Sequence, residues 1–282
     1  MFRNKESETI LFFPLRTATG TRKDSEMSDL AIKLHEALNK YGSFPTLPVG
    51  VKMVKADEDA PEKARYPLRD IGNRMAVCQG VTIARTIGWT MAFKKEDHGC
   101  PLSLIFIGHI DPQSFLDGTV SGYYQDDEES AKLMEETFPR WPMGDIKQIW
   151  LSPLARCAFE PDVAVVYGNS AQILTLIHAA NYRKGSGIAS LSTGRGGCSS
   201  WIAGAIQSNQ CTYNIPGPGE RIFGGTQDYE VSFAIPYQQY ENVIEGLKYI
   251  RKKGAFRYPV PNLAVLSEPK FPKEYYDLDP DF

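Results

Sequence analysis

The sequence predicts an α/β or α+β fold, in which buried strands alternate with amphipathic helices around one core. Apolar runs such as Val49–Val54 and Val163–Tyr167 have the length of buried strands. Ser28–Tyr41 and Tyr240–Lys253 instead repeat apolar residues at helical spacing. The composition agrees, because 42% hydrophobic and 23% charged residues among 282 are typical of a globular chain that buries a large core.

Further segments complete this alternation along the chain. Glycines such as Gly42 and Gly88 mark predicted helix ends, because a residue without a Cβ atom adopts the left-handed cap conformation at little cost. The other predicted helices are Ile71–Ile87, Glu128–Thr137 and Ala171–Tyr182, and the other predicted strands are Trp89–Phe93, Ile149–Leu154, Ile188–Leu191 and Tyr229–Ile235.

The order of these elements predicts a diverged duplication. In residues 45–110, approximately, and again in residues 160–210, a strand, a helix and a second strand lead to a glycine–cysteine pair that opens a helix. The cysteines of these pairs, Cys100 and Cys198, would take equivalent positions, and two related halves with mixed sheets would bring both to one site. The predicted organisation is an N-terminal arm (1–27), a single compact domain (28–255) with an insertion (111–148), and a tail (256–282).

Charge and hydropathy exclude several classes of partner. The net charge of −3 provides no general attraction to nucleic acid or to anionic membranes. No apolar run reaches the roughly 18 residues of a spanning helix, and the N-terminus does not have the pattern of a secretory signal. We therefore expect a cytoplasmic protein with no nucleic-acid or membrane partner, whose tail covers its own surface or a neighbouring subunit of a homo-oligomer.

A glycine-rich loop before Cys198 is the most distinctive stretch of the chain. Its glycines would let backbone N–H groups turn inward and a ligand approach closely. A helix N-terminus and the cation of Arg195 would both lower the pKa of the Cys198 thiol and favour its thiolate. An ordinary glycine turn beside a buried structural cysteine is the alternative. The residues predicted to bind a small anionic ligand are Gly194, Arg195, Gly196, Gly197, Lys52 and Arg221.

The five cysteines are expected to be free thiols, redox sites or metal ligands, because cytoplasmic proteins rarely carry structural disulfides. Iron–sulfur clusters need three or four thiolates, which come from separate parts of a fold where no compact motif exists. Zinc would accept cysteine together with His98. Burial as a small apolar side chain is the alternative for each cysteine. The predicted metal ligands are Cys78, Cys100, Cys198 and Cys211, with Cys157 as the bystander.

Two other side chains are candidates for catalytic roles. His98 follows two acidic residues and precedes Cys100, so it suits a general base or a metal ligand, although a loop histidine can equally cap the chain. Lys52 lies between Val51 and Met53 on a predicted strand, and its ammonium group must reach either the sheet edge or a polar site.

Several segments together resemble one known family, the domain-of-unknown-function 169 family of anaerobic bacteria and archaea. The likeness extends over about residues 28–255, and the two cysteine loops are its most specific parts. The segments that carry it are Pro48–Lys52, the helix with Cys78, Glu96–Pro101, Pro161–Gly168, Thr193–Cys198 and Gly219–Gly224. The resemblance implies cysteines matching Cys78, Cys100 and Cys198, often with a further one near Cys211. It implies no reaction, but oxygen-free metabolism is a setting in which iron–sulfur clusters are common.

We therefore expect a redox or cofactor-handling protein, either an oxidoreductase or an accessory protein, that binds an iron–sulfur cluster of the [4Fe–4S] type. If Cys211 is not a ligand, one iron keeps an open position, beside which Arg195, Lys52 and His98 would hold a small anion. The expected partners are this anionic ligand or a redox partner protein.

Two alternatives remain open at this stage. One is a metal-free thiol enzyme, with Cys198 or Cys100 as nucleophile and His98 as general base. The other is a non-catalytic module whose glycine loop binds a small anion or a nucleotide. Iron and sulfide analysis, alkylation with iodoacetamide and thermal-shift screening with ligands discriminate between the three hypotheses.

Overall fold

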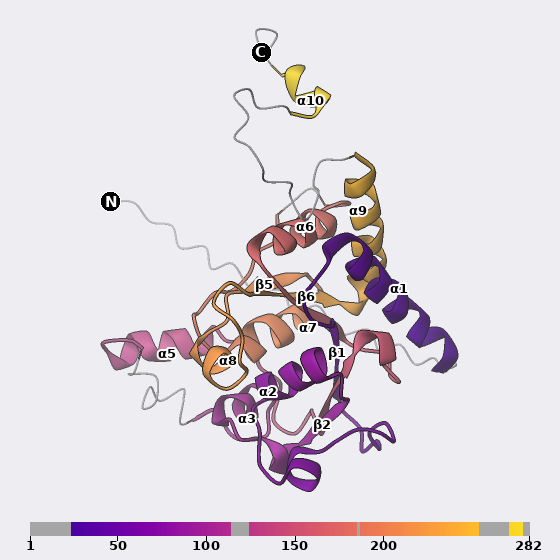
Figure 1. Ribbon diagram of the computed structural model, residues 1–282. Helices are drawn as coiled ribbons and strands as arrows, with labels where there is room; N and C mark the ends of the chain where they lie inside the picture. The colour runs from indigo at the N-terminus through magenta and orange to yellow at the C-terminus, as the bar shows by residue number, and fades with distance from the viewer. Residues whose placement is uncertain (1–23, 114–123, 185–186, 254–270, 279–282) are drawn as a thin grey trace, which may run out of the picture.

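The computed structural model describes residues 24–113, 124–184, 187–253 and 271–278. Its centre is a single six-stranded sheet with the order β2–β3–β1–β4–β6–β5, in which neighbouring strands run antiparallel (Figure 1). The strands are β1 (Val49–Val54), β2 (Met91–Lys94), β3 (Gln148–Pro153), β4 (Val163–Gly168), β5 (Thr212–Asn214) and β6 (Val231–Pro236). Most of the predicted N-terminal arm and of the tail lies outside the described residues.

Alternating side chains give the sheet two buried faces. Along β4, Val163 and Val165 point to one core, and Ala164 and Val166 point to the other. The first face is covered by α2 (Val77–Thr82), η2 (Ile83–Ile87), α3 (Pro101–Phe106), η6 (Cys198–Ala203) and α7 (Gly204–Ser208). The second face is covered by α1 (Asp24–Gly42), α6 (Ser170–Ala180) and α9 (Tyr240–Lys253).

The core of the second face holds three helices together. Leu34 of α1, Leu176 of α6 and Leu247 of α9 are all buried there. Helices α6 and α9 approach so closely that a Cβ atom on Gly246 would lie 2.2 Å from the carbonyl oxygen of Ala179. The buried residues that define this core are mainly apolar, so this face stabilises the fold by the hydrophobic effect.

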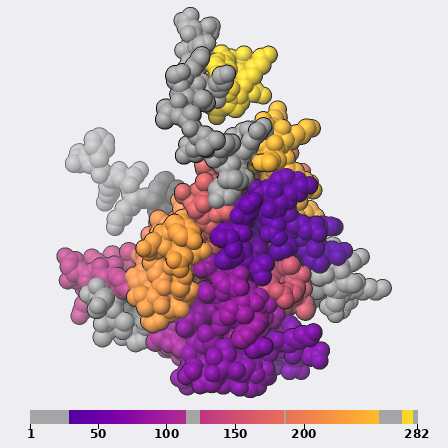
Figure 2. Space-filling model, in the orientation of Figure 1, coloured from indigo at the N-terminus to yellow at the C-terminus, as the bar shows by residue number. Residues whose placement is uncertain are grey.

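The first face carries shorter helical segments and holds three of the four cysteines predicted as metal ligands. Val77 of α2, Val165 of β4 and Trp201 of η6 belong to its core. Two of its segments, η2 and η6, are π-helical turns adjoining α-helices, a geometry that is rare and frequent at functional sites. Figure 2 shows the segment of α8 (Pro218–Ile222, orange) lying against the segment that carries α2 and α3 (purple).

Two predicted elements differ from the observed ones. The helix predicted for Ile71–Ile87 begins only at Val77, because Gly72, with a φ of 84°, ends an earlier turn. The strand predicted for Ile188–Leu191 does not form. The hydroxyl group of its serine instead exchanges hydrogen bonds with the backbone of Tyr213, which belongs to the unpredicted strand β5. The other predicted helices and strands are present within a few residues of their predicted ends.

The α+β class is confirmed, whereas the predicted duplication and mixed sheets are not. The six described strands pair only antiparallel. Helix α2 covers the first face and its supposed counterpart α6 covers the second, so the two halves do not repeat one arrangement. Strand β3, at the end of the predicted insertion, lies between β2 and β1. None of the described helices is both long and apolar enough to cross a membrane.

Candidate metal centre

Three cysteines that are distant in the sequence line one small cavity on the first face. Cys78 comes from α2, Cys100 immediately precedes α3, and Cys198 begins η6. The cavity has a volume of about 40 Å³. Its other lining residues are Ala76, Val77, Val81, Ser103, Trp201 and Glu220. The fold thus brings together three of the four cysteines that were predicted as metal ligands.

Cys78 is held in place by contacts at both ends of α2. The Gln79 side chain accepts a hydrogen bond from the backbone N–H of Ala76 (2.7 Å) and caps the start of the helix. Near the other end, Thr82 Oγ1 donates to the carbonyl oxygen of Gly224 (2.5 Å). Gly224 also packs against Cys78, because a Cβ atom there would lie 3.2 Å from Cys78 Cβ. These contacts tie α2 to the segment that follows α8.

Cys100 occupies the N-cap of α3, where Pro101 at the first helical position fixes the turn. The Ser103 hydroxyl donates to the Cys100 carbonyl oxygen (2.8 Å) and lies 3.1 Å from His98 Nδ1. Because the hydroxyl hydrogen is already used, His98 Nδ1–H is the donor in the second contact. His98 therefore lies behind Ser103 and is not one of the residues that line the cavity.

The glycine-rich loop before Cys198 is packed closely against its neighbours. Gly196 has a φ of 61°, which favours glycine, and a Cβ atom there would lie 2.7 Å from the ring of Phe138. A Cβ atom on Gly197 would lie 2.2 Å from Glu220 Oε2. These two glycines serve close packing, so this part of the loop is not the open anion-binding nest that the sequence predicted.

Glu220 is a further ionisable side chain at the cavity and is not among the site residues predicted from the sequence. It is 7% exposed. Its Oε1 accepts a hydrogen bond from the Tyr167 hydroxyl (3.2 Å), and its Oε2 accepts from Asn214 Nδ2 (3.0 Å) and from the Gly217 N–H (3.3 Å). In the sequence, a glutamate three residues after Gly217 resembles an ordinary capping residue at the start of α8, and this conceals its place at the cavity.

Burial makes two of the cavity thiols weaker acids. It raises the pKa of Cys78 to about 12, with smaller contributions from Glu220 and Cys100, and it raises the pKa of Cys198 well above its usual value. Among the described residues that line the cavity, none is cationic. The prediction that a helix N-terminus and Arg195 lower the pKa of Cys198 therefore does not hold. A bound cation would favour the thiolates instead.

Arg195 forms an ion pair and is not free to bind a ligand. Its guanidinium group, in a residue that is 7% exposed, contacts the carboxylate of Glu135 on α5 (Glu128–Glu136). It also lies 5.1 Å from the centre of the Phe138 ring. Glu135 is buried as well, so the two charges compensate each other away from water. Gly194, with a φ of 72°, precedes this pair and borders open space.

The other two cations predicted to bind an anion also lie away from the cavity. Lys52 points away from the first face, and its Nζ lies 5.5 Å from the centre of the Trp150 ring. Arg221 Nη1 pairs with Asp228 Oδ1 (2.7 Å), and its Nε donates to the carbonyl oxygen of Pro216 (2.9 Å). Neither side chain is among the residues that line the cavity.

His98 and Cys211 are buried outside the cavity lining. Burial, and then the neighbouring His109, lowers the pKa of His98 to about 3, so its imidazole is neutral. Cys211 packs with Phe233 in the core of the second face, where burial raises its pKa to about 12. Cys157, the predicted bystander, is buried in a further small core. The fold therefore places Cys211 on the wrong side of the sheet to join the other three predicted ligands.

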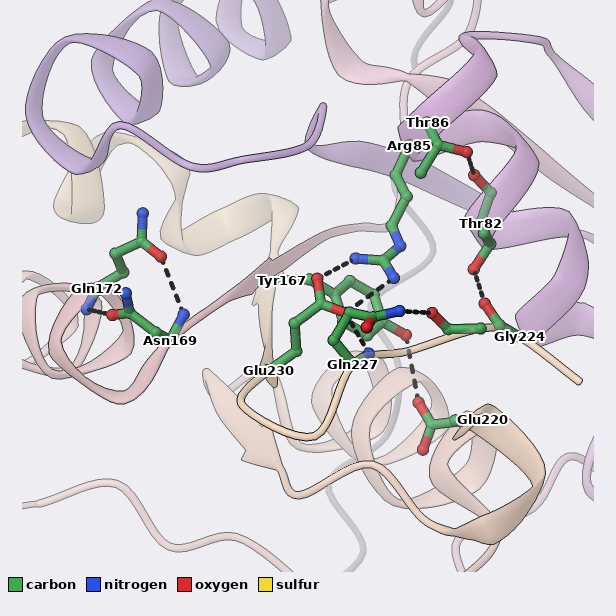
Figure 3. A network of polar contacts seen from close by, with 11 residues as sticks. Thr82, Arg85, Thr86, Tyr167, Asn169, Gln172, Glu220, Gly224, Gln227 and Glu230 are labelled. Atoms are coloured by element: carbon green, nitrogen blue, oxygen red, sulfur yellow. Dashed lines mark hydrogen bonds and ion pairs between the residues drawn. The ribbon is translucent and has the colours of Figure 1, made fainter. Parts of the chain in front are cut away.

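A polar network behind the cavity orients Glu220 (Figure 3). The Tyr167 hydroxyl donates to Glu220, and the Arg85 guanidinium carbon lies 4.1 Å from the centre of the Tyr167 ring. Arg85 Nη2 pairs in turn with Glu230 Oε2 (3.0 Å), and both of these side chains are 3% exposed. The network joins three parts of the fold, because Arg85 comes from η2, Tyr167 from β4 and Glu230 from the segment before β6. Only Tyr167 contacts the Glu220 carboxylate, and Arg85 and Glu230 support the Tyr167 ring.

The fold and the cavity define an α+β protein in which three thiols and a carboxyl group line one partly buried cavity. The chain belongs to the domain-of-unknown-function 169 (DUF169) family, which is described as uncharacterised ArCR, and the match covers residues 37–246. This range includes the six described strands and every residue that lines the cavity. The match confirms the resemblance inferred from the sequence. No curated protein and no solved structure matches the chain.

Proposed function

We propose that the protein is a cytoplasmic metal-binding protein with a redox or cofactor-handling role, in which Cys78, Cys100 and Cys198 hold the metal. The observation that supports this most is the convergence of three thiols, from separate elements, on one cavity. Thiolates are the ligands of iron–sulfur clusters and of many zinc sites. The described lining offers three thiols and one carboxyl group, which can release protons to bind a positive ion, and it contains no cation that would oppose that ion.

The donor set fits two forms of such a centre. Three cysteines suit either a single zinc or iron ion or a cluster with one further ligand position. A cluster such as [4Fe–4S] contains inorganic sulfide and a single ion does not, so the sulfide content of the purified protein distinguishes the two forms.

Even a single ion requires the side chains to adjust. Within the described residues, no group of three or more His, Cys, Asp or Glu side chains is already spaced to hold a metal ion. Rotation of a cysteine side chain about χ1 moves its sulfur between staggered positions without moving the backbone. Binding would therefore draw the three thiols inward and release their protons.

The metal and the chain would make separate contributions. A bound iron would supply electron transfer, and a bound zinc would supply a structural cross-link. The chain's own residues bind the ion and exclude water, since Val77, Val81 and Trp201 form apolar walls around the thiols. A redox partner protein is the partner we propose, because none of the cations predicted to hold a small anion lines the cavity.

Anaerobic purification followed by elemental analysis tests this proposal. We expect iron or zinc in the wild-type protein, and iron with an equal amount of sulfide if the centre is a cluster. Cys78→Ala and Cys198→Ala should lower the metal content severalfold. Cys157→Ala, which removes a buried thiol from another core, should not. A folded wild-type protein without either metal contradicts the proposal, as do equal metal contents in the three variants.

A metal-free thiol enzyme is less well supported. A nucleophilic cysteine needs its thiolate near neutral pH, but burial raises the pKa of Cys198, one of the two candidate nucleophiles. The hydrogen bond of His98 Nδ1 is to Ser103 and not to a thiol. We therefore expect slow alkylation of Cys198 in the metal-free protein by iodoacetamide at neutral pH, and one fast-reacting cavity cysteine would favour the enzyme. The small-ligand module lacks support as well, because Arg195 is already paired.

A further inference from the structure

We propose that the Glu220 carboxylate is the fourth ligand of the metal centre, in the position that the sequence assigned to Cys211. This inference rests on the proposed function, because it names the ligand that completes the same site. Among the described residues that line the cavity, Glu220 has the only carboxyl group. Cys211 belongs to the core on the other face of the sheet and cannot reach the three thiols without unfolding that core.

The backbone around Cys198 is shaped to hold the carboxylate beside the thiol. Gly197 directly precedes Cys198, and it lies so close to Glu220 that a Cβ atom would come within 2.2 Å of Oε2. The Gly217 N–H donates a hydrogen bond to Oε2. Gly217 also lies close to the glycine-rich loop, since a Cβ atom there would come within 2.6 Å of the carbonyl oxygen of Gly194. Glycines at both positions thus allow one thiol and one carboxylate to share the cavity.

Hydrogen bonds fix the direction of the Glu220 carboxylate at the cavity. From the described residues, Oε2 accepts hydrogen bonds from Asn214 and Gly217, and Oε1 accepts one from Tyr167. Three donors from separate parts of the chain thus hold one carboxylate in place among the residues that line the cavity.

The residues behind Glu220 resemble the outer hydrogen-bond partners that orient metal ligands. Such partners fix the direction of a ligating carboxylate, and their loss typically weakens metal binding 10–100-fold. Tyr167 takes this position here, and its ring is held by the buried pair of Arg85 and Glu230 (Figure 3). Tyr167 is thus a positioning residue for the metal centre, whereas Glu220 contacts the ion.

A set of three thiolates and one carboxylate defines the class of ion. Borderline divalent ions such as Zn²⁺ and Fe²⁺ accept both sulfur and carboxylate oxygen in a four-coordinate site, whereas soft Cu⁺ prefers sulfur alone. With Glu220 bound, a single ion has four protein ligands, and in a cluster the carboxylate binds the iron that lacks a cysteine. The open iron position expected from the sequence would then be closed in the resting protein.

Metal release to a chromophoric chelator tests this inference on protein purified without air. Glu220→Gln keeps the size and the hydrogen-bonding oxygen of the side chain but removes its charge, so release should be at least about tenfold faster than in the wild type. Cys211→Ala is the control and should release metal at the wild-type rate. Wild-type release from Glu220→Gln overturns the inference, and so does equally fast release from Cys211→Ala.

The outcomes separate this inference from the proposed function. If the wild-type protein holds no metal, both fail. If it holds metal and Glu220→Gln releases that metal at the wild-type rate, only the inference fails. Should Glu220→Gln not fold, Tyr167→Phe decides, because it removes only the hydroxyl that donates to Oε1. Faster release from Tyr167→Phe than from the wild type supports the inference, and an unchanged rate overturns it.

Discussion

Arg195 and Glu135 form an ion pair that is buried on both sides, with side chains 5% and 2% exposed. Removing one partner leaves an uncompensated charge away from water, so Arg195→Ala should lower the free energy of unfolding by about 3–5 kcal/mol. Replacing both, with Arg195→Met and Glu135→Leu, should cost much less, because neither charge is then left unpaired. Urea unfolding under reducing conditions measures the single and the double variant.

The exposed pair of Arg183 and Glu245 is the matched control, because its side chains are 62% and 46% exposed. Water and salt screen such a pair, so Arg183→Ala should change the free energy of unfolding by less than about 1 kcal/mol. If Arg195→Ala destabilised the protein no more than Arg183→Ala does, the pair of Arg195 with Glu135 would not be structural. Arg195 would then again be a candidate for ligand binding.

Asp162 gives a prediction about pH. Burial raises the pKa of its carboxyl group from 3.8 to about 6, against the hydrogen bond from the Met53 N–H and the charge of Lys52. Between pH 4 and 6 the folded state therefore binds more protons than the unfolded state, and the free energy of unfolding falls as the pH rises. Above pH 6 the Asp162 carboxyl group is ionised in the folded protein, and its burial then lowers the free energy of unfolding by roughly 3 kcal/mol.

Asp162→Asn removes this titration and keeps an oxygen that accepts from the Met53 N–H. We expect the variant and the wild type to be similarly stable near pH 4, and the variant to be the more stable above pH 6. Urea unfolding at pH 4.5 and pH 7.5 gives the two differences. If the variant and the wild type differed in free energy of unfolding by the same amount at both pH values, the pKa of Asp162 would not be raised in the folded protein.

Single residues also show what the sequence can and cannot predict about the site. The cavity cysteines could be selected because a thiol is rare and chemically distinctive wherever it lies. The roles of Arg195 and Glu220 could not, because each depends on a partner far along the chain. Arg195 meets Glu135 at a separation of 60 positions, and Glu220 meets Tyr167 at a separation of 53. Residue type alone suggested a free cation at Arg195 and gave no reason to select Glu220.

At the scale of elements, helices α6 and α9 approach each other closely on the second face. A Cβ atom on Gly246 would lie 2.2 Å from the carbonyl oxygen of Ala179, so the two helices would have to separate. Gly246→Ala should therefore destabilise the protein by about 1–3 kcal/mol through overpacking, although alanine favours a helix by about 1 kcal/mol over glycine. Thermal and urea unfolding measure the change.

The exposed Lys248 on the same helix is the control for Gly246. Lys248→Ala should leave stability within about 0.5 kcal/mol of the wild type, because it changes no buried contact. Folded Gly246→Ala should also retain its metal, since the cavity lies on the other face of the sheet. A stabilised Gly246→Ala protein would show that the helices can separate freely at this crossing.

Elements with strong periodicity were predictable, and elements with weak local signals were not. The helix at Tyr240–Lys253 was predicted with its observed bounds, because one apolar stripe faces the core along its whole length. Strand β5 was missed because it is three residues long, and its pairing with β6 is not local. The predicted strand at Ile188–Leu191 had the composition of a strand, but its backbone finds no partner strand in the sheet.

At the scale of the whole molecule, the sheet order could not be predicted from local patterns. Strands that are buried on both faces read as continuous apolar runs, which do not reveal which helix covers which face. The repeated order of strand, helix, strand and cysteine therefore suggested two equivalent halves. In the fold, α2 and α6 cover opposite faces, and the cysteines meet because α2, α3 and η6 share the first face.

This arrangement makes the proposed metal a cross-link for the whole first face. A ligand that binds only the folded state stabilises it by about 2.7 kcal/mol at a concentration 100 times its dissociation constant. The melting temperature should therefore rise when Zn²⁺ or Fe²⁺ is added anaerobically to the metal-free protein. Hydrogen exchange should slow most in α2, η6 and α8, and least in α6 and α9. Cys198→Ala should show neither effect, and an equal shift in that variant would place the metal elsewhere.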